Sequence, residues 1–259
     1  NQMTENKFPT EIVDLPSKGH FYPEDNPLSS GKIELRYMTA RDEDILTSVN
    51  LIQQGKALDK LLQGLIVDKK VNYNDLLVGD KNAILLAARI LAYGKEYEFT
   101  FIDSYGERVT TKSDLSELDS KEFNLKDYKK GINAFTFELP NTKRILGYSL
   151  PTHKDETEIQ IELDAVRQVF KDNPGAINRE NSTRLKSLIK SVDGNTDKGF
   201  INNFVDNEFL SVEAKEFRTY VAKINPDVNF VTNAKNSRGE KEMVAVPMTA
   251  KFFWPESTI

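Results

Sequence analysis

The feature that most constrains the fold is an abrupt change of hydrophobic period between residues 32 and 47. Apolar residues recur at every second position from Ile33 to Tyr37, as on one face of a strand. From Ile45 to Ile52 they recur at the three-to-four spacing of a helix. Thr39 lies between the two patterns with Asp42 three residues later, a pair that predicts a capping box at the helix start. The chain is therefore expected to be of the α+β class.

The same order of strand, capped junction, helices and hairpin occurs a second time. Thr152–Glu156 repeats the pattern of Thr39–Glu43, and the turn Gly106–Arg108 is matched by Gly239–Lys241. Capping boxes and glycine turns are common, so duplication and chance coincidence both remain open. We expect two similar halves, residues 32–131 and 132–259, each with strands, then a helical layer, then a β-hairpin.

Residues 1–31 are rich in proline and turn-forming residues, which predicts an extended N-terminal arm with an edge strand at residues 10–15. Such a segment has little local means of ordering itself, so we expect it to gain structure mainly on assembly. The remaining periodicity predicts helices at residues 41–53, 58–66, 81–93, 159–170, 185–192, 200–205 and 211–224, and extended pairs at 97–109, 135–148 and 228–248.

Composition excludes much familiar chemistry. The chain has no cysteine, which removes disulfides, thiol nucleophiles and thiolate metal sites, and only His20 and His153 supply imidazoles. A formal net charge of −5 argues against nucleic acid as a main partner. No apolar run approaches the ~20 residues that span a bilayer, and the first residues do not resemble a signal peptide. We expect synthesis in a cytoplasm and no membrane segment.

The acids Asp42, Glu43 and Asp44 could form a paired-carboxylate site of the kind a glycosidase needs. Their place in a predicted first helical turn favours capping instead, because the helix N-terminus attracts negative charge. His153 lies in the matching turn of the second half with no recognised nucleophile motif, so a surface histidine is favoured over a general base. We expect no enzymatic activity, no cofactor and no bound metal.

Several motifs together resemble the baseplate hub and hub-assembly proteins of T-even-type contractile-tailed bacteriophages. They are Leu15–Gly19, Tyr22–Pro23, Leu28–Gly31, Tyr37–Thr47 and Phe252–Pro255. The resemblance implies a structural subunit of the tail baseplate hub, assembled in the host cytoplasm, with other tail proteins as partners. A hub-assembly chaperone absent from the virion is the alternative. A tail-associated cell-wall hydrolase acting through Asp42 and Glu43 is a distant one.

Exposed-looking aromatic and apolar residues are the candidates for contacts with partners or with a second copy. For the C-terminal aromatic run, internal packing is favoured over a partner contact, although both are open. The partner-contact candidates are Phe8, Ile12, Phe21, Tyr22, Tyr105, Phe252, Phe253 and Trp254.

The chain departs from the family it resembles at its hairpin turns. The resemblance implies a Cys-x-x-Cys-Gly zinc knuckle there, which members often carry, whereas this chain has Ile102–Gly106 and Asn236–Gly239. A structural zinc supplies on the order of 10 kcal/mol of apparent folding free energy. Without it the hairpins must be held by packing, so we expect the face that carries Phe99 and Phe101 to dock on the helices or on a partner.

Overall fold

The computed structural model describes residues 9–248, except residue 54, together with residues 252–253. Within these residues the chain is a mixed α+β protein, as the change of period predicts. The helices are α1 (Ala40–Thr47), α2 (Val49–Gln53), α3 (Ala57–Leu65), α4 (Val78–Tyr93), α5 (His153–Phe170), α6 (Glu180–Leu188), α7 (Lys198–Asn207) and α8 (Ser211–Ile224). The strands are β1 (Thr10–Asp14), β2 (Lys32–Arg36), β3 (Glu96–Ile102), β4 (Arg108–Asp114), β5 (Phe135–Glu138), β6 (Ile145–Tyr148), β7 (Ile189–Val192), β8 (Val231–Lys235) and β9 (Lys241–Ala245).

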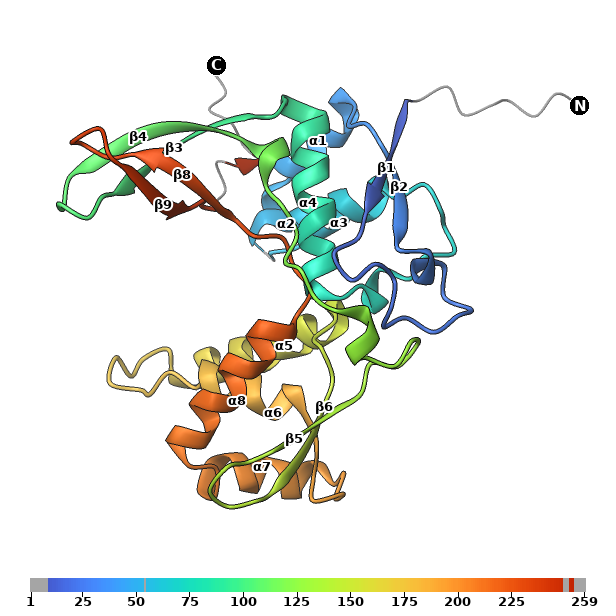
Figure 1. Cartoon of the computed structure of the whole chain (residues 1–259), viewed down its shortest axis with the longest axis vertical. Coiled ribbons are helices and arrows are strands. Elements are labelled where there is room, and N and C mark those ends of the chain that lie inside the picture. The colour runs from blue at the N-terminus through green and yellow to red at the C-terminus, as the bar shows by residue number, and fades with distance from the viewer. Residues whose placement is uncertain (1–8, 54, 249–251, 254–259) are drawn as a thin grey trace, which may run out of the picture.

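The elements are arranged in two lobes (Figure 1). The main lobe holds β1, β2 and α1–α4, with the hairpins β3–β4 and β8–β9 projecting from one side. The second lobe holds α5–α8 and the sheet β5-β6-β7. The chain enters the second lobe after β4 and returns to the main lobe after α8, so the final hairpin lies beside the first one.

All the sheets of the described residues are small and antiparallel. Three have two strands each, β1-β2, β3-β4 and β8-β9, and one has the order β5-β6-β7. The strand sets that open the two halves therefore differ, as do the helices that follow them. What recurs between the halves is confined to the two capping boxes and the two hairpin turns described below.

The junction at residues 32–47 forms as its sequence predicts. β2 ends at Arg36, α1 begins at Ala40, and Thr39 and Asp42 make a capping box. The helix does not run on to residue 53, however, because Ser48 takes an extended conformation, with φ −69° and ψ 109°, and separates α1 from α2.

The prediction of a helix through residue 192 is wrong at its C-terminal end. α6 stops at Leu188, and the next four residues form β7, which pairs with β6. The apolar residues Ile189 and Val192 fit either period, but both are β-branched and both are fully buried in the sheet. Tertiary pairing decides the conformation here.

Residues 9–31 pack on the main lobe within the single chain, and the expectation that this segment gains structure mainly on assembly stays a prediction. β1 pairs with β2 as an edge strand, and the loop after it buries Leu15 and Leu28. Gly19 and Gly31, both at positive φ, allow the loop to close on itself. A Cβ at Gly19 would lie 2.3 Å from the Ser29 carbonyl oxygen, so the turn excludes any larger residue.

The lobes share one contiguous apolar core and a tight backbone joint. The N–H of Val78 donates to the Pro151 carbonyl at 3.0 Å, and the N–H of His153 donates to the Leu76 carbonyl at 2.8 Å. At Gly79 an added Cβ would lie 1.7 Å from the Pro226 carbonyl oxygen, so this joint requires glycine. None of the helices in the described part of the chain has the length and apolar character needed to cross a membrane.

Candidate partner-binding surfaces

The two hairpin turns fold identically in their local hydrogen bonds. In the first, the Asp103 carboxylate accepts the N–H groups of Tyr105 and Glu107 at 3.0 and 2.8 Å. In the second, the Asn236 side-chain oxygen accepts the N–H groups of Arg238 and Glu240 at 2.9 and 3.0 Å. Each turn also has its glycine at positive φ, which confirms the matched turns read from the sequence.

These two turns lie against each other, in a set of interactions called here the tip contact. The second oxygen of Asp103 accepts the backbone N–H of Ser237 at 3.0 Å and also its hydroxyl. The Arg238 guanidinium lies 3.7 Å from the centre of the Tyr105 ring, whose hydroxyl donates to Glu240 at 2.9 Å. The Ser237 hydroxyl, ahead of the backbone N–H donors, lowers the pKa of Asp103 to about 2.

The tip contact lies at the two turns for which the resemblance implies zinc knuckles in other members. Its groups are hydroxyls, backbone N–H groups, a guanidinium and carboxylates. In the parts of the chain that the structure describes, no three His, Cys, Asp or Glu side chains gather so as to hold a metal ion. That the protein binds no metal stays a prediction, which elemental analysis of purified protein tests.

The aromatic face of the first hairpin, expected to dock either on the helices or on a partner, packs within the chain. Tyr97 and Phe99 are buried. The Tyr97 ring meets Phe252 edge to face, with 5.1 Å between the ring centres, and the Arg89 guanidinium of α4 lies 5.6 Å from each ring. The hairpin is thus fixed to a helix and to the C-terminal segment.

Phe252 and Phe253 are 1% and 2% exposed, so neither is available to a partner. The internal-packing alternative therefore holds for these two candidates. Trp254 and Phe8 lie outside the described residues. Tyr105 and Ile12, with 40% and 59% exposure, remain accessible at the hairpin tip and on β1.

Phe21 and Tyr22 are 2% and 4% exposed, so their side chains lie inside the chain and not on its surface. Phe21 packs edge to face against Phe135, with 5.6 Å between ring centres. Tyr22 donates its hydroxyl at 2.6 Å to Asp80, a carboxylate at the start of α4 that is fully buried. This hydrogen bond fixes the loop that carries these aromatics to the start of α4.

Asp80 also accepts the backbone N–H and the hydroxyl of Ser17 at 2.9 and 2.6 Å. The Tyr22 oxygen in turn accepts the N–H of Leu77 at 2.9 Å. Burial raises the pKa of Asp80, against the opposing effect of these donors. The sequence alone marks Asp80 only as the residue before the helix expected at 81–93, because its partners lie 58 to 63 residues away in the chain.

Asp42, in the first turn of α1, has the capping role that the sequence favours. Both oxygens of Asp42 accept from Arg36, at 2.7 and 2.9 Å, and one accepts the Thr39 N–H at 2.8 Å. The Arg36 hydrogen bond, ahead of Thr39, lowers the pKa of Asp42 to about 2. A glycosidase needs one carboxyl whose pKa is raised so that it can donate a proton. Asp42 is shifted in the opposite direction.

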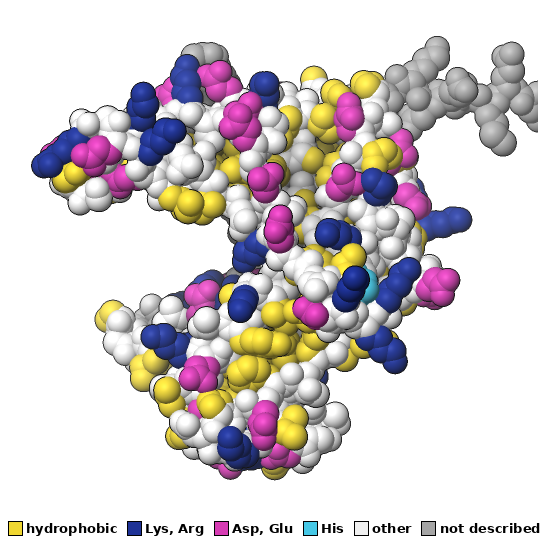
Figure 2. Space-filling model, in the orientation of Figure 1, with side chains coloured by type: hydrophobic (Ala, Val, Ile, Leu, Met, Phe, Trp, Pro, Cys, Tyr) yellow, Lys and Arg dark blue, Asp and Glu magenta, His cyan; other side chains and the backbone are white. Residues whose placement is uncertain are grey.

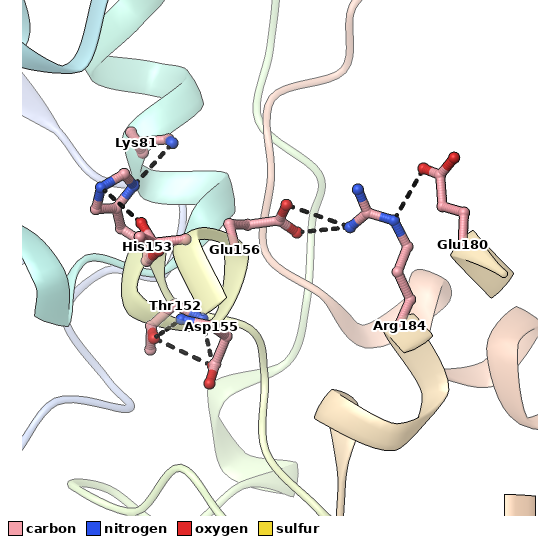
Figure 3. Close-up of polar contacts among 8 residues, drawn as sticks. Lys81, Thr152, His153, Asp155, Glu156, Glu180 and Arg184 are labelled. Atoms are coloured by element: carbon pink, nitrogen blue, oxygen red, sulfur yellow. Dashed lines mark hydrogen bonds and ion pairs between the residues drawn. The ribbon is translucent and has the colours of Figure 1, made fainter. Parts of the chain in front are cut away.

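His153 lies at the joint between the lobes (Figure 3). Its Nδ1 is 3.1 Å from the Lys81 ammonium, and its ring packs on Tyr73 with 4.6 Å between centres. Burial, followed by the Lys81 charge, lowers the pKa of His153, so the neutral ring accepts a hydrogen bond from the Lys81 ammonium. His20 is likewise structural, since its Nε2 lies 2.7 Å from the Tyr128 carbonyl oxygen.

Thr152 and Asp155 start α5 with a second capping box, which Figure 3 shows beside His153. The next acid, Glu156, accepts from Arg184 of α6 at 2.9 Å. Arg184 also donates to Glu180 at 3.2 Å. The first turn of α5 therefore connects the main lobe, through Lys81, with the helices of the second lobe.

Comparison with known proteins places these features in a wider group. A family model described as T4 bacteriophage base plate protein matches residues 9–254. This span contains both lobes, both hairpins and every residue that the structure describes. No curated protein sequence and no solved structure matches the chain.

Proposed function

The chain belongs to the T4 bacteriophage base plate protein family, and we propose that it is a structural, non-enzymatic subunit of the baseplate hub that binds other tail proteins and stays in the virion tail. Family membership supports a baseplate role. The position in the hub and the retention in the mature particle rest on the resemblance of motifs such as Tyr37–Thr47 to hub proteins.

The observation that carries a binding role is the hairpin arm, defined here as β3, β4, β8 and β9 with their turns. Figure 1 shows the arm projecting from the main lobe. Its aromatic residues Tyr97 and Phe99 are buried, whereas Ile102 and Met243 are 62% and 73% exposed. Each hairpin also has strand edges that no other strand of the described chain pairs with. Exposed apolar side chains beside open strand edges are suited to pairing with a partner's strand.

Protein composition of purified mature particles tests this proposal. We expect mass spectrometry to find the protein in a fixed ratio to other tail proteins. Its presence during assembly but absence from finished particles would instead identify the hub-assembly chaperone. Met243→Asp on the arm should lower incorporation, whereas Ile177→Asp, at an equally exposed apolar site between α5 and α6, serves as the control.

The distant alternative of a cell-wall hydrolase has its own test. Glu43 is exposed, and its neighbour Asp42 is bound to Arg36 on both oxygens. We expect no peptidoglycan cleavage by the purified protein. Cleavage that disappears in Glu43→Gln would overturn the structural proposal.

A further inference from the structure

The second lobe has an apolar groove that nothing in the described chain fills. It lies between the first turn of α5 and the facing sides of α6 and α8, where Figure 2 shows apolar side chains gathered on the surface. Its volume is about 260 Å³, whereas ~150 Å³ is enough to admit a benzene ring into an apolar cavity. The apolar lining includes Ile159, Leu185, Leu188 and Val221.

The charges around this groove are paired, with one exception. Asp155 lies 3.5 Å from the Lys190 ammonium, and Glu156 accepts from Arg184 at 2.9 Å (Figure 3). Arg218, on α8, donates at 2.7 Å to the neutral side chain of Asn181 and forms no ion pair with any carboxylate of the described residues. The rim thus offers one unmatched positive charge beside an apolar hollow.

We propose that this groove binds a segment of a partner protein that presents one large apolar side chain next to a carboxylate. The apolar side chain fills the hollow and displaces water that the Ile159, Leu185 and Val221 walls cannot hydrogen-bond. The carboxylate accepts from Arg218, whose planar guanidinium is suited to bidentate contact. The proposal rests on the proposed function in one respect, namely which kind of protein carries the segment. The chemistry of recognition depends on the groove alone.

Three probes of one size and different charge test it on the full chain. They are 3-phenylpropionate, 3-phenylpropan-1-ol and 3-phenylpropylammonium, each titrated while amide NMR shifts are followed. We expect shifts in α5, α6 and α8, with the acid binding about three- to five-fold more tightly than the alcohol, the effect of one exposed charge pair. The ammonium probe should bind most weakly.

Variants at exposed positions separate the two parts of the proposal. Arg218→Gln should abolish the advantage of the acid, and Arg218→Lys should restore part of it. Arg108→Gln, on β4, is the control because Arg108 is an exposed arginine outside the groove. Ala222→Trp, on the exposed rim, should block all three probes without altering the core. Unchanged circular dichroism and urea midpoints confirm that each variant folds.

Equal or tighter binding of the ammonium probe, or shifts that Ala222→Trp leaves intact, would overturn the proposal. Shifts of groove amides that grow with protein concentration and no probe would identify a second copy as the occupant and overturn it too. The result does not depend on particle composition. If the protein is absent from mature particles but its groove selects the acid probe, only the proposed function is refuted. If the protein is present in mature particles but its groove does not select the acid probe, only the groove proposal is refuted.

Discussion

At the scale of single residues, four buried charges have no oppositely charged partner within the described chain: Asp80, Arg89, Asp103 and Glu213. Each is held by hydrogen bonds to another segment. Glu213 accepts the N–H groups of Asn141 and Thr142 at 2.9 and 3.0 Å, and Arg89 donates to the Gly94 carbonyl at 2.8 Å. Because an unsatisfied buried charge is costly, each of these residues fixes the segment that satisfies it.

Replacing Asp80 by Asn should destabilise the protein by about 2–4 kcal/mol. The amide would put an N–H₂ group where a carboxylate oxygen now accepts from Ser17 or Tyr22. Tyr22→Phe, which removes one donor, should cost about 1–2 kcal/mol. Urea unfolding measures both. The control is Asp75→Asn at an exposed acid, and a stability of Asp80→Asn equal to that of the control would contradict the role assigned to Asp80.

His153 should make stability depend on pH near neutrality. Its folded-state pKa is lowered by burial and by Lys81, so below pH 6.5 the unfolded chain binds more protons than the folded one. Stability contributed by the neutral ring is therefore present above pH 6.5 and is lost as the pH falls, by at most about 1.4 kcal/mol per pH unit.

Urea unfolding at pH 7.5, 6.5 and 5.5 checks this expectation. His153→Gln should flatten the loss between pH 6.5 and 5.5, and Lys81→Met should reduce it by removing a like charge. An identical pH dependence in all three proteins would show that His153 does not titrate differently on folding.

At the scale of elements, local signals predict starts and turns better than they predict ends and pairings. The capping boxes at Thr39 and Thr152 and both hairpin turns follow from residues within four positions of each other. The strand β7 does not, since the spacing of its apolar residues fits a helix equally well and only its pairing with β6 decides. Among the candidate contacts, burial of Phe21 depends on rings more than 100 residues away, which no local pattern reports.

The tip contact should join the two hairpins through Asp103. Asp103→Ala removes acceptors for four N–H and hydroxyl donors, so both turns should exchange amide hydrogens faster. Hydrogen exchange with mass spectrometry should show the change at residues 104–107 and 236–240. Arg144→Ala is a control because it removes an ion pair in the second lobe. Faster exchange confined to residues 104–107 would show that the turns are independent.

At the scale of the whole molecule, α4 is the element on which distant parts of the chain meet. Asp80 near its start holds residues 17–22, and Arg89 farther along holds the hairpin and Phe252. Its first turn also forms the joint with the second lobe, through Val78 and Gly79. The single core spans both lobes for this reason.

Phe252→Ala should destabilise the entire protein by about 3–5 kcal/mol, because it leaves a cavity against Tyr97 and Arg89. One cooperative urea transition at a lower midpoint is expected. Ile177→Ala, at a side chain that is 82% exposed, is the control and should change stability by less than about 0.5 kcal/mol. Two separate transitions would show that the lobes unfold independently.

The docking of residues 17–22 and of Phe252 on α4 has a consequence for synthesis on the ribosome. Ser17 pairs with a residue 63 positions later, whereas Tyr97 donates to the Pro247 carbonyl 150 positions away. The loop of residues 17–22 can therefore close early, but Arg89 and Tyr97 stay uncovered until residues 247–252 have been translated. A nascent chain of this kind exposes Tyr97 and Arg89 to other proteins for most of its elongation, and premature termination leaves that surface open to aggregation.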